Sequence, residues 1–339
     1  MRTDDFDYFL PPERIAQTPV EPRHASRLLV VNRASDQLEH RHFWEVGDYL
    51  RPGDLLVVNH TRVLPARIFA RKPTGGKVEI LLLRQEEDQV WEALVGGKRV
   101  TAGLSLQLED GASVKVEAVL DGSRRRLRFE GPVQPYLERH GQMPLPPYIH
   151  TPLGNPERYQ TVYAAQPGSA AAPTAGLHFT PELMDALRAK GVGFATVTLH
   201  VGLDTFAPVT EDDPQEHVIH TEWCQLTPET AAQIEAARQA GGRVIAVGTT
   251  SVRTLESAAR AAGPGQSVAA YSGPTDLFIL PGYKFRAVDA MITNFHLPRS
   301  TLLMLVSAFA GRERMLAAYA EAVRLEYRFF SFGDAMLIV

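Results

Sequence analysis

The sequence predicts an α/β (α+β) main domain with a mixed sheet, into which a small antiparallel β-barrel is inserted. Apolar and polar residues alternate between Arg67 and Glu130, which is typical of strands with one buried face. In the C-terminal half, strand and helix patterns alternate, which is typical of a central sheet covered by helices. Two apolar LLVV runs, at 28–31 and 55–58, are expected in that same sheet.

The alternating region contains about six short strands. Val78, Ile80 and Leu82 alternate with polar neighbours, and so do Leu127 and Phe129. Turn sequences separate the strands: TGG at 74–76, GG at 96–97, EDG at 109–111 and DG at 121–122. Short strands joined in this way predict a small barrel. We therefore expect a barrel at 62–145 and one discontinuous α/β domain at 1–61 and 146–339, with the Pro-rich stretch 142–152 as the return linker.

Three helix starts are visible in the C-terminal half. Thr180 and Thr227 each precede a proline and a glutamate, the order typical of an N-cap and a first helical turn. The strand patterns FATVTLHV and RVIAV follow these helices, and a third helix is expected near Ser251. The run AAQPGSAAAPTAG at 164–176 is expected to be a flexible loop with few anchors.

Composition limits the class of protein. The chain has 339 residues, 45% of them hydrophobic and 22% charged, which is typical of globular proteins. The longest apolar stretch, 302–310, is too short to cross a bilayer, and the N-terminus is acidic and interrupted by prolines, unlike a signal peptide. We therefore expect a cytoplasmic protein. The single Cys224 excludes an internal disulfide and a zinc site built on two thiolates.

The run MITNFHLPRSTLLMLVSAFAG at 291–311 contains the most informative local pattern. A polar turn with Asn294 and His296 ends at Pro298, and Ser300 and Thr301 stand where a helix N-cap is expected. Such a turn brings an imidazole, an amide and free backbone N–H groups to one place, which suits a small polar ligand. The alternative is a capped turn without a ligand.

A second candidate site follows the apolar strand at 244–247. Gly248 ends the strand, Thr249, Thr250 and Ser251 follow, and Arg253 stands in the first helical turns. Backbone N–H groups at a helix N-terminus suit a carboxylate or a phosphate. Neither the Walker pattern GxxxxGK[ST] nor the dinucleotide pattern GxGxxG is present. The alternative is a well-capped helix.

The segment HVIHTE contains His217, His220 and Glu222, which form a third candidate. Two imidazoles and a carboxylate can bind a metal, but the histidines do not have the four-residue spacing of helical zinc motifs. A metal-free acid/base cluster is favoured, because histidine titrates near neutral pH. Surface histidines beside the acidic run EDDPQE are the alternative.

Two further turns carry histidine. His200 ends a strand and is followed by Gly202 in TLHVGLDTF, and His178 precedes a helix start in PTAGLHFT. The carboxyl ends of strands are where α/β proteins bind ligands. Several such turns together are a stronger indication of a site than any one of them.

Basic residues are concentrated in the predicted barrel. Because the formal net charge of the chain is −4, a nucleic-acid partner requires such a local patch. The residues expected to contact an RNA backbone are Arg62, Arg67, Arg71, Lys98, Arg124, Arg125 and Arg126. A solvated strand face is the alternative.

These motifs together identify a family resemblance that extends nearly from end to end. The segments that carry it are FDYFLPPERIAQTPVEPRHASRLLVV, VVNHTRVLPAR, PTAGLHFT, LHVGLDTF, HVIHTE, VGTTSVRTLES, GPTDLFILPGYKF and TNFHLPRSTLLMLVSAFAG. They resemble the S-adenosylmethionine:tRNA ribosyltransferase-isomerases of queuosine biosynthesis. The resemblance implies an α/β domain with an inserted barrel and an enzyme without a metal. It implies transfer of the ribosyl part of S-adenosylmethionine to 7-aminomethyl-7-deazaguanine at the tRNA wobble position, giving epoxyqueuosine, adenine and methionine.

The reaction needs acid and base groups, and histidine with a pKa near neutrality is the natural choice. The expected catalytic pool is His178, His200, His217, His220, Glu222 and His296. The residues expected to bind S-adenosylmethionine are Thr174, Gly176, Gly202, Thr249, Thr250, Ser251, Arg253 and Asn294. Asp204 stands where the family has glycine as often as aspartate, so it is not expected to be essential. S-adenosylmethionine is expected as a co-substrate, with no permanent cofactor and no metal, and the enzyme is expected to be a monomer.

Two other functions compete with this one. A metal-dependent hydrolase acting on a nucleotide would use HVIHTE and would lose its activity to a chelator. A non-enzymatic RNA-binding module would use the barrel and would need no small-molecule pocket.

Overall fold

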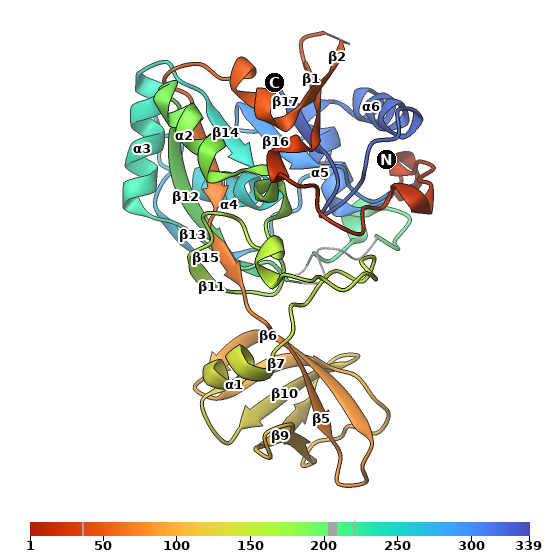
Figure 1. The fold of residues 1–339 in the computed structure, drawn as a ribbon. Coiled ribbons are helices and arrows are strands. Elements are labelled where there is room, and N and C mark those ends of the chain that lie inside the picture. The colour runs from red at the N-terminus through yellow and green to blue at the C-terminus, as the bar shows by residue number, and fades with distance from the viewer. Residues whose placement is uncertain (36, 203–208, 220) are drawn as a thin grey trace. The chain divides into compact units, whose positions relative to one another are not determined.

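A computed structural model describes residues 1–35, 37–202, 209–219 and 221–339. They form two compact units (Figure 1). The first unit comprises Met1–Thr61, Pro147–Gln166 and Ala172–Val339, and the second comprises Arg62–Pro146 and Pro167–Ala171. Asp204 and His220 lie outside the described residues. None of the helices in the described ranges has the length and apolar character needed to cross a membrane.

The first unit is built on a mixed sheet, which confirms the predicted fold class. Its strand order is β15 (Tyr271–Thr275), β13 (Glu222–Leu226), β12 (Gly193–Leu199), β3 (Leu55–Asn59), β14 (Val244–Val247), β16 (Ala290–Asn294), β17 (Ala335–Ile338), β1 (Arg27–Val31) and β2 (Leu38–His42). Strands β12, β3, β14 and β16 are parallel, while β13 and β17 pair antiparallel at either side of this block. Both LLVV runs lie in the sheet, as predicted.

The helices begin where the capping residues predict. The α-helices of this unit are α2 (Pro181–Ala189), α3 (Pro228–Gln239), α4 (Thr249–Ala261), α5 (Thr301–Ala310) and α6 (Arg312–Arg324). Short 3-10 helices are η1 (Thr3–Phe6), η2 (Pro12–Arg14), η3 (Arg23–Ala25), η4 (Phe43–Tyr49), η5 (Pro156–Tyr159), η6 (Thr174–His178) and η8 (Pro214–Glu216). Side chains of Thr180, Thr227 and Ser300 accept hydrogen bonds from backbone N–H groups of the helices they precede.

Helices cover both faces of the sheet. Leu55 and Val57 of β3 pack in a core with side chains from α3, α4, α5 and α6. Leu56 and Val58 of the same strand point the other way and pack with α2, η4 and η6. Because both faces are buried, β3 is a continuous apolar run and shows no alternation.

The second unit contains the predicted barrel, which is closed and six-stranded. Its order is β10 (Arg124–Phe129), β7 (Val90–Val95), β6 (Lys77–Glu87), β5 (Arg67–Arg71), β8 (Ser105–Leu108) and β9 (Ser113–Val119). The alternating residues Val78, Ile80 and Leu82 are buried inside it. Helix α1 (Val133–His140) follows β10, and β4 (Thr61–Val63) pairs with β11 (Gln166–Ser169) in a separate two-stranded sheet.

The prediction of a flexible loop at 164–176 is wrong. The segment contains β11 and the start of η6, and Ala170–Ala172 are buried. A Cβ added at Gly176 would lie 2.0 Å from the Tyr163 hydroxyl oxygen. Small side chains serve close packing here, so a composition rich in alanine and glycine did not indicate a free loop.

The carboxyl ends of the parallel strands meet at one edge of the sheet, and Asn59 joins three elements there. Its Nδ2 donates to the Leu199 carbonyl (3.0 Å) and to Thr250 Oγ1 (3.3 Å). Its Oδ1 accepts from the backbone N–H groups of Leu199 and Thr61 (both 3.2 Å). The fully buried side chain thus connects the ends of β3 and β12 with the start of α4.

We predict that Asn59→Ala destabilises the first unit by about 2 kcal/mol or more, because it leaves buried backbone groups of Leu199 without partners. The exposed Asn32, replaced by alanine, is the matched control and is expected to change stability by less than about 0.5 kcal/mol. Denaturant unfolding followed by circular dichroism measures both. Equal stability of the two variants would contradict this role of Asn59.

Candidate active site

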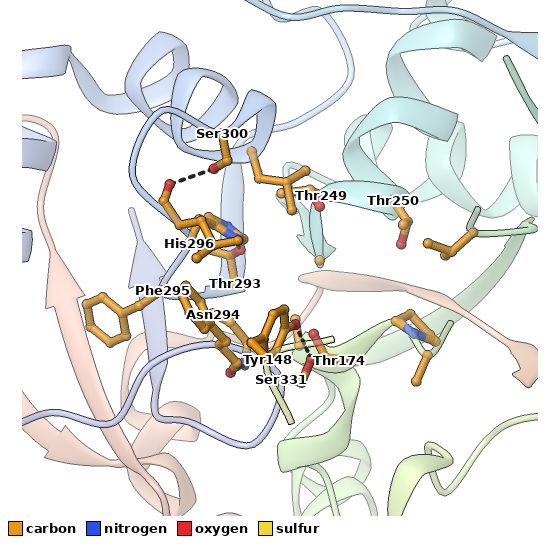
Figure 2. A pocket seen from close by; sticks show the side chains of 18 residues that line it. Tyr148, Thr174, Thr249, Thr250, Thr293, Asn294, Phe295, His296, Ser300 and Ser331 are labelled. Carbon is orange, nitrogen blue, oxygen red and sulfur yellow. Dashed lines mark hydrogen bonds between the residues drawn. The ribbon is translucent and has the colours of Figure 1, made fainter. Parts of the chain in front are cut away.

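The edge where the parallel strands end contains a cavity. Its volume is about 630 Å³, including the part open to solvent. It is lined by Tyr148, Ala172, Pro173, Thr174, Ala175, Val201, Gly248, Thr249, Thr250, Thr293, Asn294, Phe295, His296, Leu297, Ser300, Leu302, Phe330 and Ser331. Figure 2 shows Thr249 and Thr250 on one side and His296 on the other. There is no Lys, Arg, Asp or Glu among these lining residues of the described chain.

The start of α4 forms one wall. Gly248 is the N-cap, with a φ of 87°, and no side chain caps the helix. The N–H groups of Thr249, Thr250 and Ser251 belong to the first helical turn, which lacks intrahelical acceptors, and the helix dipole adds partial positive charge. Ser251 does not line the cavity, because its Oγ donates to the Val247 carbonyl (2.8 Å). This wall suits an anionic group.

The β16–α5 turn forms the opposite wall. His296 Nε2 is hydrogen-bonded to Thr293 Oγ1 (2.9 Å), and its backbone N–H donates to the Tyr319 hydroxyl (2.9 Å). Burial lowers the pKa of His296 to about 3. Ser300 both caps α5, accepting from the Leu303 N–H (3.1 Å), and lines the cavity. The ligand and capping interpretations of this turn are therefore compatible.

The side-chain amide of Asn294 has one atom without a hydrogen-bond partner among the described residues. Its Nδ2 donates to the Phe330 carbonyl (2.9 Å) and lies 3.4 Å from His178 Nε2. Its Oδ1 is buried and has no partner among the described residues. A buried acceptor without a partner is costly, so this oxygen is suited to a ligand donor.

His178 lies behind Asn294 and does not line the cavity. Its Nδ1 is hydrogen-bonded to Ser26 Oγ (2.7 Å), and its ring packs against Phe43. Burial, helped by the charges of Arg328 and Arg23, lowers the pKa of His178 to about 3. Burial favours the neutral form of His178 and His296, and their expected acid/base roles stay predictions.

Comparison with known proteins now assigns the family. The sequence model of the queuosine biosynthesis proteins matches residues 3–338. The chain belongs to this family. It is 57% identical to the S-adenosylmethionine:tRNA ribosyltransferase-isomerase of Moorella thermoacetica and 58% identical to that of Symbiobacterium thermophilum, in each case over 100% of both chains. The crystal structure of the S-adenosylmethionine tRNA ribosyltransferase from Thermotoga maritima is similar, with 44% identity, 99% and 100% of the two chains covered, and a TM-score of 0.58.

Two residues of this family member that were expected in the site bind each other instead. Arg253 forms a buried ion pair with Glu222, and its Nε donates to the Leu277 carbonyl (3.1 Å). Glu222 also accepts from the Gly202 N–H (2.8 Å). None of these three residues lines the cavity. Their arrangement indicates a structural role, and roles as a cofactor anchor or a catalyst stay predictions.

Two other histidines of the pool, His200 and His217, are not among the lining residues of the cavity. His217 Nδ1 is 2.9 Å from Glu211 Oε2. His200 stacks on Trp223 with ring centroids 5.5 Å apart, and burial with the nearby His60 lowers its pKa. Within the described ranges, no group of three or more His, Cys, Asp or Glu residues is placed to hold a metal ion. Neither histidine lines the cavity, so their catalytic roles also stay predictions.

The predicted RNA-contact residues of the barrel are largely engaged within it. Arg67, Arg124 and Arg126 form ion pairs with Glu79, Glu92 and Glu86 at 2.5, 3.1 and 2.6 Å. Two others donate to backbone carbonyls: Arg125 to Val100 and Arg71 to Gly75. Lys98 is exposed, and its backbone carbonyl accepts from Lys72. Residues 62–146 contain 14 Lys and Arg against 11 Asp and Glu, so the segment has a net charge of +3 in a chain of −4. Contact with RNA stays a prediction for these residues and for Arg62.

The sequence did not indicate that several of the cavity residues belong to the site. Tyr148 lies in the Pro-rich linker, where its hydroxyl meets Ser331 Oγ at 2.7 Å, and Phe330 lies just before the last strand. They are far apart in sequence, so only folding brings them together. Asn59 did have a signal, because it ends an apolar strand within the motif VVNHTRVLPAR.

The two buried histidines predict a loss of stability in acid. Their folded pKa of about 3 lies below the ordinary value of 6.5, so the unfolded chain takes up protons first. The free energy of unfolding should therefore fall as pH decreases from 6.5 towards 3, by about 2 kcal/mol for each histidine at pH 5. Urea unfolding of wild type and His296→Gln from pH 7 to 4.5 measures this. A variant whose pH dependence is as steep as that of wild type would contradict the assignment.

Proposed function

We propose that the uncharged cavity of the first unit binds S-adenosylmethionine and that its ribosyl transfer begins there. The chain is an S-adenosylmethionine:tRNA ribosyltransferase-isomerase of queuosine tRNA modification, the activity named for relatives more than 50% identical to it over their full length. Its substrates are S-adenosylmethionine and tRNA. The proposed acceptor is 7-aminomethyl-7-deazaguanine at the wobble position, and the proposed products are epoxyqueuosine in tRNA, adenine and methionine.

The observation that carries the proposal is the start of α4, which no side chain caps, in a cavity whose described lining residues include no Lys, Arg, Asp or Glu. The N–H groups of Thr249 and Thr250 supply partial positive charge for the methionine carboxylate. The sulfonium is cationic, so a wall without Lys or Arg avoids repulsion, and neutral imidazoles do the same. Both charges of this substrate therefore find a suitable environment.

Asn294 and His296 are proposed to contact the adenosine part. Asn294 Oδ1 accepts a hydrogen bond from a substrate N–H or O–H, and His178 positions the Asn294 amide from behind. His296 makes a hydrogen bond as a neutral imidazole, because a pKa of about 3 makes it a poor proton donor at neutral pH. Burial thus favours substrate positioning over acid catalysis for both histidines.

The substrate itself supplies much of the activation. The sulfonium acidifies the hydrogens on the ribose 5′ carbon, and methionine leaves as a neutral thioether when the epoxide closes. Adenine needs a proton to leave easily, and the attacking amine must be unprotonated. The cavity contributes chiefly by orienting these groups and excluding water.

The central test is incubation of the protein with S-adenosylmethionine and tRNA that bears 7-aminomethyl-7-deazaguanine, followed by mass analysis of the nucleosides. We expect a ribosyl-derived mass gain on the modified base and release of adenine. Without that mass gain, the proposed reaction is wrong.

We predict that Thr249→Val weakens S-adenosylmethionine binding about tenfold, because a methyl group replaces a hydroxyl at the proposed carboxylate site while the β-branched shape is kept. Isothermal titration calorimetry measures the affinity. The exposed Thr101 in the barrel, replaced by valine, is the matched control. If the two variants bind equally well, the Thr249 hydroxyl does not contact the substrate.

A further inference from the structure

The first unit has a second cavity, which adjoins the first. Its lining includes Val20, Arg23, Ser26, Arg158, His178 and Ser331, and its volume is about 280 Å³, including the part open to solvent. Ser331 lines both cavities. His178 lines the second and contacts Asn294 in the first. The two cavities are thus separated by only a few side chains.

Two guanidinium groups distinguish the second cavity from the uncharged first one. Arg23 Nη1 donates to the Gln160 carbonyl (2.5 Å), and its Nη2 donates to the Glu157 carbonyl (2.8 Å). Arg158 Nη2 donates to the Val20 carbonyl (2.8 Å). Carbonyl acceptors orient a guanidinium without neutralising its charge, so both groups stay cationic.

Carboxylates only partly balance this charge. Arg158 forms an ion pair with Glu21 (2.7 Å), whose side chain is 73% exposed and therefore well screened by water. Arg23 has no ion pair within 4 Å among the described residues. Burial lowers its pKa, and the like charge of Arg158 lowers it further, while Glu21 and Glu157 act in the opposite direction. Two neighbouring cations, whose nearby carboxylates Glu21 and Glu157 are both exposed to solvent, favour an anion.

We propose that the Arg23–Arg158 cavity binds a backbone phosphate of the tRNA substrate beside the modified nucleoside. The inference rests on the proposed function, because it requires the target base to reach the first cavity. A nucleotide with its base there keeps its phosphates covalently attached, so they must lie at the rim of that cavity. Planar guanidinium groups bind phosphate oxygens in pairs, which suits this position.

Arg23 differs from three of the barrel arginines. Arg67, Arg124 and Arg126 have carboxylate partners within 3.1 Å, as Arg158 does, whereas Arg23 donates to carbonyl groups. The charge of Arg23 is therefore less compensated than that of these three barrel arginines. The barrel remains a candidate for more distant contacts with the same RNA.

The test compares Arg158→Gln and Arg23→Gln with Arg324→Gln, whose arginine is exposed and paired with Glu321 on α6, away from both cavities. Fluorescence anisotropy gives the tRNA affinity over a series of KCl concentrations, without S-adenosylmethionine. We expect each cavity variant to bind tRNA about five- to tenfold more weakly and to lower the slope of log K against log [salt] by about 1. Arg158→Lys should keep the slope, and S-adenosylmethionine affinity should stay within about twofold in all of them.

Unchanged tRNA affinity and salt slope in Arg158→Gln and Arg23→Gln, with wild-type thermal unfolding, would overturn the phosphate site. Loss of inorganic phosphate binding without loss of tRNA binding would overturn it too, since the cavity would then hold only a small anion. Failure of the proposed function looks different: wild type would give no ribosyl-derived product at any salt concentration.

Discussion

The buried amide of Asn59 is the interaction on which the site depends. It satisfies the backbone of Leu199 at the end of β12 and reaches Thr250 at the start of α4. Because the amide of Asn59 has both donors and an acceptor, it can bind the ends of two strands and the start of a helix at once. An apolar side chain at position 59 could not make these hydrogen bonds. That connection holds the start of α4, with its uncapped amides, against the ends of β3 and β12.

The site also shows a separation of charge between neighbouring cavities. The first has no Lys, Arg, Asp or Glu among its described lining residues, and its histidine is kept neutral by burial. The second contains two arginines oriented by carbonyl groups. A sulfonium substrate and a polyanionic one need opposite environments, and an uncharged wall of Asn294, His178 and Ser331 lies between the two.

Sequence patterns predicted the architecture well. Alternation with turn residues predicted the closed barrel, and Thr180, Thr227 and Ser300 marked helix starts, because both signals depend on local geometry. The flexible loop predicted at 164–176 from local composition was wrong, because the small residues there allow close packing. No motif indicated that burial lowers the pKa of His178 and His296, since burial is a property of the whole fold, and their catalytic roles stay predictions.

By itself, the sequence determined the fold class, the helix starts and the family resemblance, because periodicity, capping and long motifs are written in neighbouring residues. Thr174, Thr249, Thr250, Asn294 and His296 were expected in one site, and the cavity does contain them. Only the tertiary structure shows that Arg253 and Glu222 form an ion pair with each other and do not line this cavity. It also shows that Tyr148 and Ser331, from distant segments of the chain, do line it. The physical reason is that burial and ion pairing depend on which strand ends and helices meet in space, and sheet order is set by contacts between residues far apart in the chain.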